Sequence, residues 1–198
     1  ECGEVVDGDQ LMSICGNYMK QKGTLKKNTI VATVMSNLGM FLMGEREGIH
    51  IEKTKVGDRY VLENMLENGY NIGGEQSGHI IFLDENTTGD GLLSALHLLQ
   101  VMTETKKKLS ELASIMEVLP QALVNAKVPN HKKEHFEEYA EIAEAIAEVE
   151  AKFAGEGRVL IRPSGTEPLV RVMIEGKDQQ LIESEAQKLA ELISSIML

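Results

Sequence analysis

Two prolines, Pro163 and Pro168, bracket a short turn between two segments that are expected to be strands. Those segments, 158–162 and 169–174, are rich in Val, Ile and Leu. Proline has no backbone N–H and fixes φ, and it also restricts the residue before it, so neither strand can continue through the turn. The pattern predicts two strands joined by a rigid turn, the tightest local constraint in the chain.

The turn also carries groups that suit an anion. Ser164 and Thr166 supply hydroxyls, and Gly165 allows backbone amides to approach a ligand closely. Arg162 and Arg171 flank the turn, and guanidinium groups grip phosphate through paired, charge-assisted hydrogen bonds. Phosphate binding is the favoured interpretation, and an ordinary hairpin turn with surface charges is the alternative.

The overall charge makes this local cluster more informative. The chain of 198 residues has a formal net charge of −11, which argues against a nucleic-acid-binding surface. Arginine is rare in it, and Arg158, Arg162 and Arg171 all fall within the hairpin segment. Three positive charges on an acidic body are expected to form one focus for a small anion.

Other features bear on location and metal binding. No apolar run is long enough to span a bilayer, no signal peptide opens the sequence, and Cys2 and Cys15 lack metal-ligand spacing. These features favour a cytoplasmic protein without membrane contact. Asp7 and Asp9 are too few for a metal site and are expected to serve at a helix N-terminus.

The order of predicted elements indicates two domains. In residues 1–119, strands at 29–34, 49–54 and 79–83 alternate with helices, the pattern of an α/β layered domain with a mixed sheet. Residues 120–198 begin with a strand at 122–129 and an acidic helix at 135–154. The hairpin and a last amphipathic helix follow, and this order fits a small α+β domain with helices on one face of an antiparallel sheet.

A second candidate site is the glycine-rich segment 73–79, between predicted strands at 70–72 and 79–83. Glu75 can accept hydrogen bonds from sugar hydroxyls, Ser77 can donate or accept, and His79 can exchange protons near neutral pH. A third candidate, Asp58 with Arg59, follows the strand at 49–54, at the end where open α/β sheets place ligands. The alternatives are a glycine-rich turn with a structural histidine, and a helix cap with a solvated arginine.

These segments together resemble the α-D-phosphohexomutase superfamily. The resemblance is carried by Gly74-Glu75-Gln76-Ser77-Gly78-His79 and by the segment 162–168, with support from 34–39 and 87–91. Gln76 favours the amino-sugar branch over the phosphomannomutase/phosphoglucomutase branch. The resemblance implies that residues 1–119 are the third domain of a four-domain enzyme and residues 120–198 the fourth, with a TATA-binding-protein-like fold.

The resemblance also implies roles for the candidate residues. The third-domain loop binds sugar hydroxyls, the fourth-domain loop holds the phosphate that is not being transferred, and His79 is a possible acid or base. The implied sugar-binding residues are Gly74, Glu75, Gln76 and Ser77 with Asp58 and Arg59, and the implied phosphate-binding residues are Arg162, Ser164, Gly165, Thr166 and Arg171.

The implied reaction interconverts glucosamine 6-phosphate and glucosamine 1-phosphate, for amino-sugar and peptidoglycan precursors, through a phosphoserine and a 1,6-bisphosphate. In the family the serine lies in the first domain and the Mg²⁺ loop in the second, and neither motif is found here. We therefore expect domains 1 and 2 of the same enzyme as partners, and a possible homodimer of the full-length enzyme. For these residues alone we expect no catalytic activity and no bound Mg²⁺. A phosphomannomutase or phosphoglucomutase, a non-enzymatic sugar-phosphate-binding module and a purely structural domain are the alternatives.

Overall fold

The computed structural model describes residue 1 and residues 3–198, so the prediction about Cys2 lies outside it. The chain divides into two units, Glu1–Val118 and Leu119–Leu198. In the parts of the chain that the structure describes, no helix combines the length and apolar character needed to cross a membrane.

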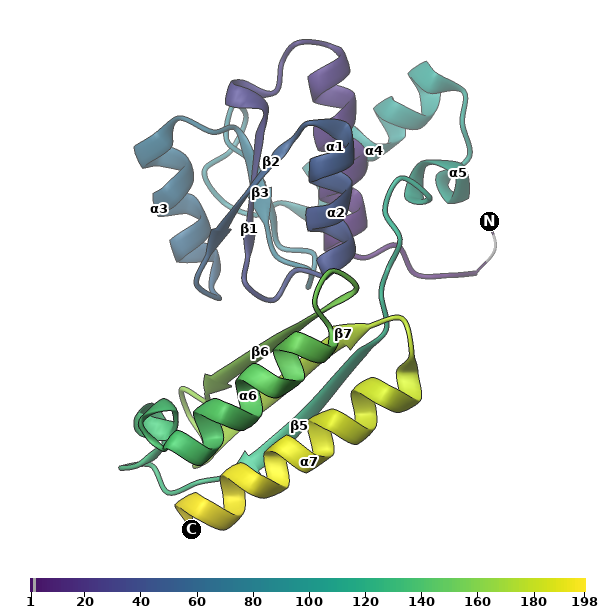
Figure 1. The fold of residues 1–198 in the computed structure, drawn as a ribbon. Helices are drawn as coiled ribbons and strands as arrows, with labels where there is room; N and C mark the ends of the chain where they lie inside the picture. The colour runs from purple at the N-terminus through teal and green to yellow at the C-terminus, as the bar shows by residue number, and fades with distance from the viewer. Residues whose placement is uncertain (2) are drawn as a thin grey trace. The chain divides into compact units, whose positions relative to one another are not determined.

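The first unit is built on a four-stranded mixed sheet in the order β2-β1-β3-β4 (Figure 1). Its strands are β1 (Thr29–Thr33), β2 (His50–Thr54), β3 (Ile72–Gly74) and β4 (Ile80–Phe82). β1 runs parallel to β2 and β3, whereas β4 is antiparallel to β3. Every residue of β1 is buried, as its β-branched composition predicts. The predicted mixed-sheet α/β class is confirmed.

Helices cover both faces of this sheet. Ile30 and Ala32 of β1 belong to a core shared with α1 (Gly8–Gln21), α2 (Leu38–Glu47) and α4 (Gly91–Thr105). Val31 points the other way and packs with Val61 and Met65 of α3 (Asp58–Asn68). The short elements η1 (Lys26–Asn28) and α5 (Leu109–Ala113) complete the unit.

Helix caps account for several acidic residues. Asp7 accepts a hydrogen bond from the Gln10 amide in a capping box at α1, and Asp90 accepts from the Leu92 and Leu93 amides at α4. The prediction that Asp58 caps α3 is wrong, because Gly57 is the N-cap residue and Asp58 is the first helical residue. The Asp58 carboxylate instead accepts a hydrogen bond from the amide of the next residue, Arg59, at 2.8 Å.

The strand predicted at 70–72 is displaced toward the loop. β3 spans Ile72–Gly74, so two of the expected loop glycines lie in the strand. Close strand packing explains this difference: a Cβ atom on Gly73 would lie 2.8 Å from the Val31 carbonyl oxygen, and one on Gly74 would lie 2.5 Å from that of His79.

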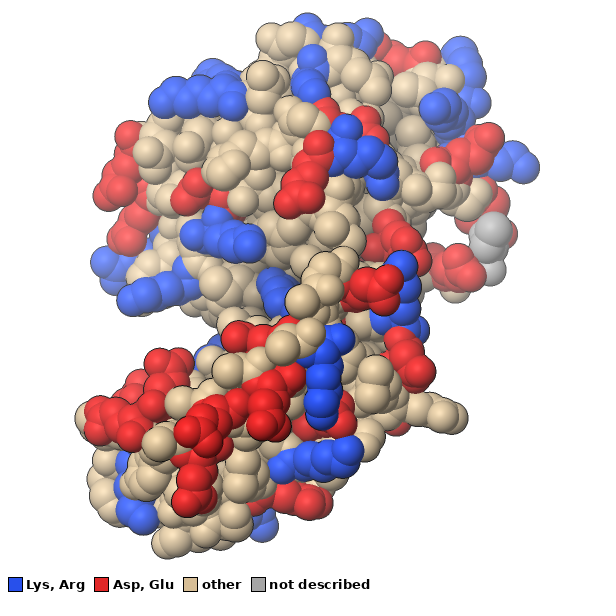
Figure 2. Space-filling view, in the orientation of Figure 1, with Lys and Arg blue, Asp and Glu red and all other residues tan. Residues whose placement is uncertain are grey.

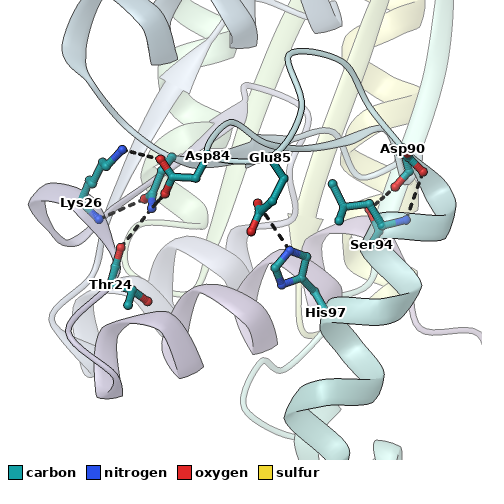
Figure 3. Close-up of polar contacts among 9 residues, drawn as sticks. Thr24, Lys26, Asp84, Glu85, Asp90, Ser94 and His97 are labelled. Carbon is teal, nitrogen blue, oxygen red and sulfur yellow. Dashed lines mark hydrogen bonds and ion pairs between the residues drawn. The ribbon is translucent and has the colours of Figure 1, made fainter.

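A polar cluster holds the opposite end of the β3–β4 pair (Figure 3). The buried Asn71 side chain donates to Asp84 Oδ2 at 2.7 Å and to the Thr24 carbonyl at 3.0 Å, and Lys26 pairs with Asp84. These contacts, with that of Lys26 first, lower the pKa of Asp84. They anchor the strand pair at the end remote from its connecting loop.

The second unit is a three-stranded antiparallel sheet in the order β5-β7-β6, with helices packed on one face (Figure 1). The elements are β5 (Gln121–Lys127), η2 (Lys133–Glu138), α6 (Ala140–Lys152), β6 (Gly157–Pro163), β7 (Leu169–Gly176) and α7 (Gln179–Met197). The predicted α+β class is confirmed. The acidic residues of the α6 region face solvent, and Figure 2 shows Asp and Glu side chains gathered over this helix.

The continuous helix predicted at 135–154 is wrong. A 3-10 segment precedes α6, and Tyr139 between them is extended, with φ −86° and ψ 114°. Phe136 and Ile142 are both buried, yet six positions along one α-helix place two side chains on different faces. The break at Tyr139 allows both side chains to enter the same core.

Candidate functional site

The turn between β6 and β7 is organised by its own backbone and by Ser164. The two strands pair up to Pro163 opposite Val170, and the Ser164 amide donates to the Leu169 carbonyl at 2.9 Å. Ser164 is only 1% exposed, and its Oγ accepts a hydrogen bond from the Glu167 amide at 3.2 Å. Hydrogen bonds within the turn thus define its shape, as its two prolines indicate.

Arg162 and Arg171 face each other across the β6–β7 pair. Burial, and then the neighbouring Arg171, lower the pKa of Arg162. Arg171 forms an ion pair with Glu167 at 3.1 Å, but its Nε is buried and has no hydrogen-bond partner in the described chain. An unsatisfied buried donor beside a second guanidinium is unfavourable in the protein alone. An anion that contacts both groups would satisfy the donor and offset the repulsion.

The surface of the turn is open. A Cβ atom built on Gly165 meets nothing within 4 Å, and Gly165 and Thr166 are both exposed. Five predicted phosphate-binding residues therefore lie in or beside one turn: Arg162, Ser164, Gly165, Thr166 and Arg171. Their role in binding stays a prediction.

The prediction that Arg158 belongs to the same positive focus is wrong. Its guanidinium pairs with Glu175, at 2.9 Å from Nε and 2.7 Å from Nη2, and Glu175 is fully buried. Arg158 is also opposite Glu175 in the strand register, away from the turn. Only two of the three arginines in this segment, Arg162 and Arg171, lie at the turn.

In the first unit, the carboxyl ends of β1, β2 and β3 bring three loops to one edge of the sheet. The carboxylate of Glu75, in the β3–β4 loop, accepts a hydrogen bond from the Gly57 amide at 3.2 Å. The loop itself is closed by the Glu75 amide, which donates to the His79 carbonyl at 3.0 Å. A backbone φ of +97° at Gly78 makes glycine necessary at this turn.

His79 lies where two further loops meet. Its Nε2 is 3.4 Å from Asp58 Oδ2, and Gly89 lies against its ring. The structure therefore brings together Asp58, Glu75 and His79 from two predicted sites. Gly89 belongs to the segment 87–91, which supports the family resemblance.

The remaining predicted sugar-binding residues are distributed around this cluster. Gln76 lies 3.4 Å from Asp7 Oδ2 through its side-chain amide, and Ser77 is exposed. Gly74 lies in β3. Arg59 forms an exposed ion pair with Glu63 at 2.7 Å, and no described contact connects it to Glu75 or His79.

One structural role was not visible in the sequence. Asp9 is completely buried and accepts a hydrogen bond from the Asn37 amide at 2.7 Å, so it joins α1 to the loop before α2. In residues 1 and 3–198, no group of three or more His, Cys, Asp or Glu side chains could hold a metal ion. The residues described therefore do not form a site for the Mg²⁺ that the family resemblance implies.

Comparison with known families gives the class of the protein. The phosphoglucomutase/phosphomannomutase α/β/α domain III matches residues 7–119, and the C-terminal domain of the same family matches residues 123–192. The chain belongs to the phosphoglucomutase/phosphomannomutase family, as the superfamily resemblance predicts.

Within this family, the chain is similar to phosphoglucosamine mutases. It is 63% identical over 193 residues to that of Ruminiclostridium cellulolyticum and 64% identical over 193 residues to that of Acetivibrio thermocellus. Each match covers 98% of this chain and 43% of the relative. The chain thus spans less than half the length of these relatives and corresponds to their C-terminal half.

Solved structures show the same fold. Aspergillus fumigatus N-acetylphosphoglucosamine mutase in complex with GlcNAc-6P and magnesium matches with a TM-score of 0.78 and 17% identity, over 98% of this chain and 45% of that one. An N-acetylglucosamine-phosphate mutase in its substrate complex matches with a TM-score of 0.69 and 23% identity. This match covers 94% of the present chain and 44% of that mutase.

Proposed function

We propose that this chain is the substrate-binding half of a phosphoglucosamine mutase, which interconverts glucosamine 6-phosphate and glucosamine 1-phosphate. The observation that carries the proposal is the pairing of Arg162 with Arg171 beside an open, preformed turn. The buried Arg171 Nε lacks a partner within the described chain, and a phosphate oxygen is the kind of acceptor that it needs. The similarity to phosphoglucosamine mutases supports the choice of substrate.

In this proposal, each unit has its own binding role. Arg162, Arg171 and the backbone of the turn hold the phosphate that is not transferred. Glu75 accepts hydrogen bonds from sugar hydroxyls with its carboxylate, which the Gly57 amide already orients. Gly74, Gln76, Ser77, Asp58 and Arg59 complete the sugar site.

His79 is the proposed acid or base. Asp58 can orient its ring through Nε2 at 3.4 Å, and a fixed imidazole can give or take a proton at a sugar oxygen. The phosphoserine and the Mg²⁺ that assist phosphoryl transfer would come from other domains of the enzyme. These 198 residues would then bind substrate weakly without converting it.

A titration of the 198-residue chain tests the proposal. We expect the Gly165 and Thr166 amide resonances to shift on addition of glucosamine 6-phosphate, and the Glu75 loop to respond to it more than to inorganic phosphate. Binding of mannose 6-phosphate in preference would favour a phosphomannomutase or phosphoglucomutase. Absence of binding to any phosphosugar would contradict the proposal and favour a structural domain, and conversion of glucosamine 6-phosphate above background would contradict the predicted inactivity.

A further inference from the structure

Lys133 lies against the phosphate-binding turn, although it is distant from the turn in sequence. It begins η2, and its side chain is almost completely enclosed, with 8% of the residue exposed. Its ammonium group donates hydrogen bonds to the Ser164 carbonyl and to the Glu167 carbonyl, the latter at 3.2 Å. Both acceptors are backbone atoms of the turn, so one side chain holds the turn near its two ends.

Within residues 1 and 3–198, the ammonium group of Lys133 forms no ion pair with a carboxylate. Among the residues that the structure describes, the lysines that form ion pairs with carboxylates are Lys22, Lys26, Lys152 and Lys188, and Lys133 is not one of them. A buried charge that is not offset by an opposite charge is costly, and two carbonyl dipoles offset only part of that cost. A dianion bound on the turn would supply the opposite charge.

The contact with Ser164 also fixes the direction of a donor. In a trans peptide the C=O and the N–H point in opposite directions, and the structure contains no cis peptide in its described part. The carbonyl of Ser164 points to Lys133, so the N–H of the following residue, Gly165, points away from it. Gly165 itself is exposed, and a Cβ built on it meets nothing within 4 Å.

We propose that Lys133 is a positioning residue of the phosphate site: it holds the Ser164–Gly165 peptide with its N–H toward the ligand, and it places a positive charge behind the turn. This proposal rests on the proposed function, because it assumes that the ligand of the turn is a phosphate. The sequence did not single out Lys133, since one lysine in a polar stretch resembles a surface residue.

The adjacent lysine provides a matched control. Lys132 also donates to a backbone carbonyl, that of Met197 at the end of α7, at 2.8 Å. It has the same charge and is adjacent in sequence, but it has no described contact with the turn. Lys132→Met and Lys133→Met therefore remove equal charges, and only the second change removes the contacts with Ser164 and Glu167.

The experiment is a titration of the 198-residue chain with inorganic phosphate, followed by the amide resonances of the turn. We expect Lys133→Met to weaken phosphate binding by about tenfold or more and to shift the Gly165 resonance before any phosphate is added. Lys132→Met should stay within about twofold of the unmodified chain. Aminoethylation of Lys133→Cys, in a Cys2→Ser background, rebuilds an ammonium group of similar length and should restore both the resonance and the affinity.

The outcomes separate the two proposals. If the unmodified chain binds no phosphate, the proposed function fails, and the ligand-free Gly165 resonance still decides whether Lys133 orients the peptide. If Lys133→Met binds phosphate as tightly as Lys132→Met and leaves Gly165 unshifted, the role of Lys133 is overturned. Should Lys133→Met fail to fold, Lys133→Gln keeps a donor without the charge, and unchanged phosphate affinity in that variant would overturn the electrostatic part.

Discussion

Gly89 lies directly against the imidazole ring of His79, so closely that a Cβ atom built on Gly89 would be 2.5 Å from the ring Cε1. The next residue, Asp90, caps α4 and donates its amide to the Ile80 carbonyl at 3.3 Å. One short segment therefore starts a helix, attaches it to β4 and leaves space for the histidine proposed to act on the sugar.

A side chain at position 89 should displace that ring. We expect Gly89→Ala to destabilise the chain by about 1–3 kcal/mol, as overpacking usually does, and to change the His79 ring resonances. Chemical denaturation and NMR measure the two effects. Gly91→Ala is the control, because nothing lies within 4 Å of a Cβ at that position. Equal effects of the two substitutions would contradict this role of Gly89.

The sequence predicted those parts of the fold that depend on local chemistry. The buried strand β1 follows from a β-branched run, and the β6–β7 hairpin follows from two prolines between such runs. The break before α6 could not be predicted, because the acidic residues and helical spacing continue through Tyr139, and only the shared core shows that Phe136 must also be buried.

The candidate site was predictable to a similar extent. Residue types identified the turn at 162–168 and the loop at 74–79, because prolines, glycines and polar side chains are rarely combined so closely. The contacts of Lys133, Asp9 and Gly89 depend on residues far apart in sequence, and the pairing of Arg158 with Glu175 depends on strand register. A local sequence pattern does not show which distant residues come into contact.

Arg162 should contribute to binding but little to stability. Replacing it with Met removes a proposed phosphate-binding group and also a like charge opposite Arg171. We expect phosphate affinity to fall by about 1.5–3 kcal/mol, the range for a charged hydrogen bond, with little loss of stability. Calorimetric titration and thermal unfolding measure the two quantities.

Arg158→Met should lower stability and leave phosphate binding nearly unchanged, the opposite of Arg162→Met. It leaves the buried Glu175 without its guanidinium partner, and breaking a buried pair costs about 3–5 kcal/mol. Phosphate binding by the folded fraction should change little. If Arg158→Met weakened phosphate binding as much as Arg162→Met, the assignment of Arg158 to the scaffold would be incorrect.

Glu75→Gln tests the sugar site separately from the phosphate site. Glutamine can still accept the hydrogen bond from the Gly57 amide, so we expect stability within about 1 kcal/mol of the unmodified chain. The affinity for glucosamine 6-phosphate should fall toward that for inorganic phosphate, because a neutral amide accepts less strongly from sugar hydroxyls. The ratio of the two dissociation constants is the measurement. Glu63→Gln, which alters only the exposed pair with Arg59, should leave that ratio unchanged.

Cys15 should make stability fall at alkaline pH. Burial raises the pKa of its thiol from 9.0 to about 12, so the folded chain keeps a proton that the unfolded chain releases above pH 9. The contribution of this group to stability is complete below that pH and is lost progressively as the pH rises toward 12, by at most about 1.4 kcal/mol per pH unit. We expect urea unfolding of the Cys2→Ser variant to show a steeper loss between about pH 9 and 11 than the same variant with Cys15→Ala. Equal slopes would show that Cys15 ionises alike in both states, and rapid reaction of Cys15 with a thiol reagent at pH 8 would contradict its burial.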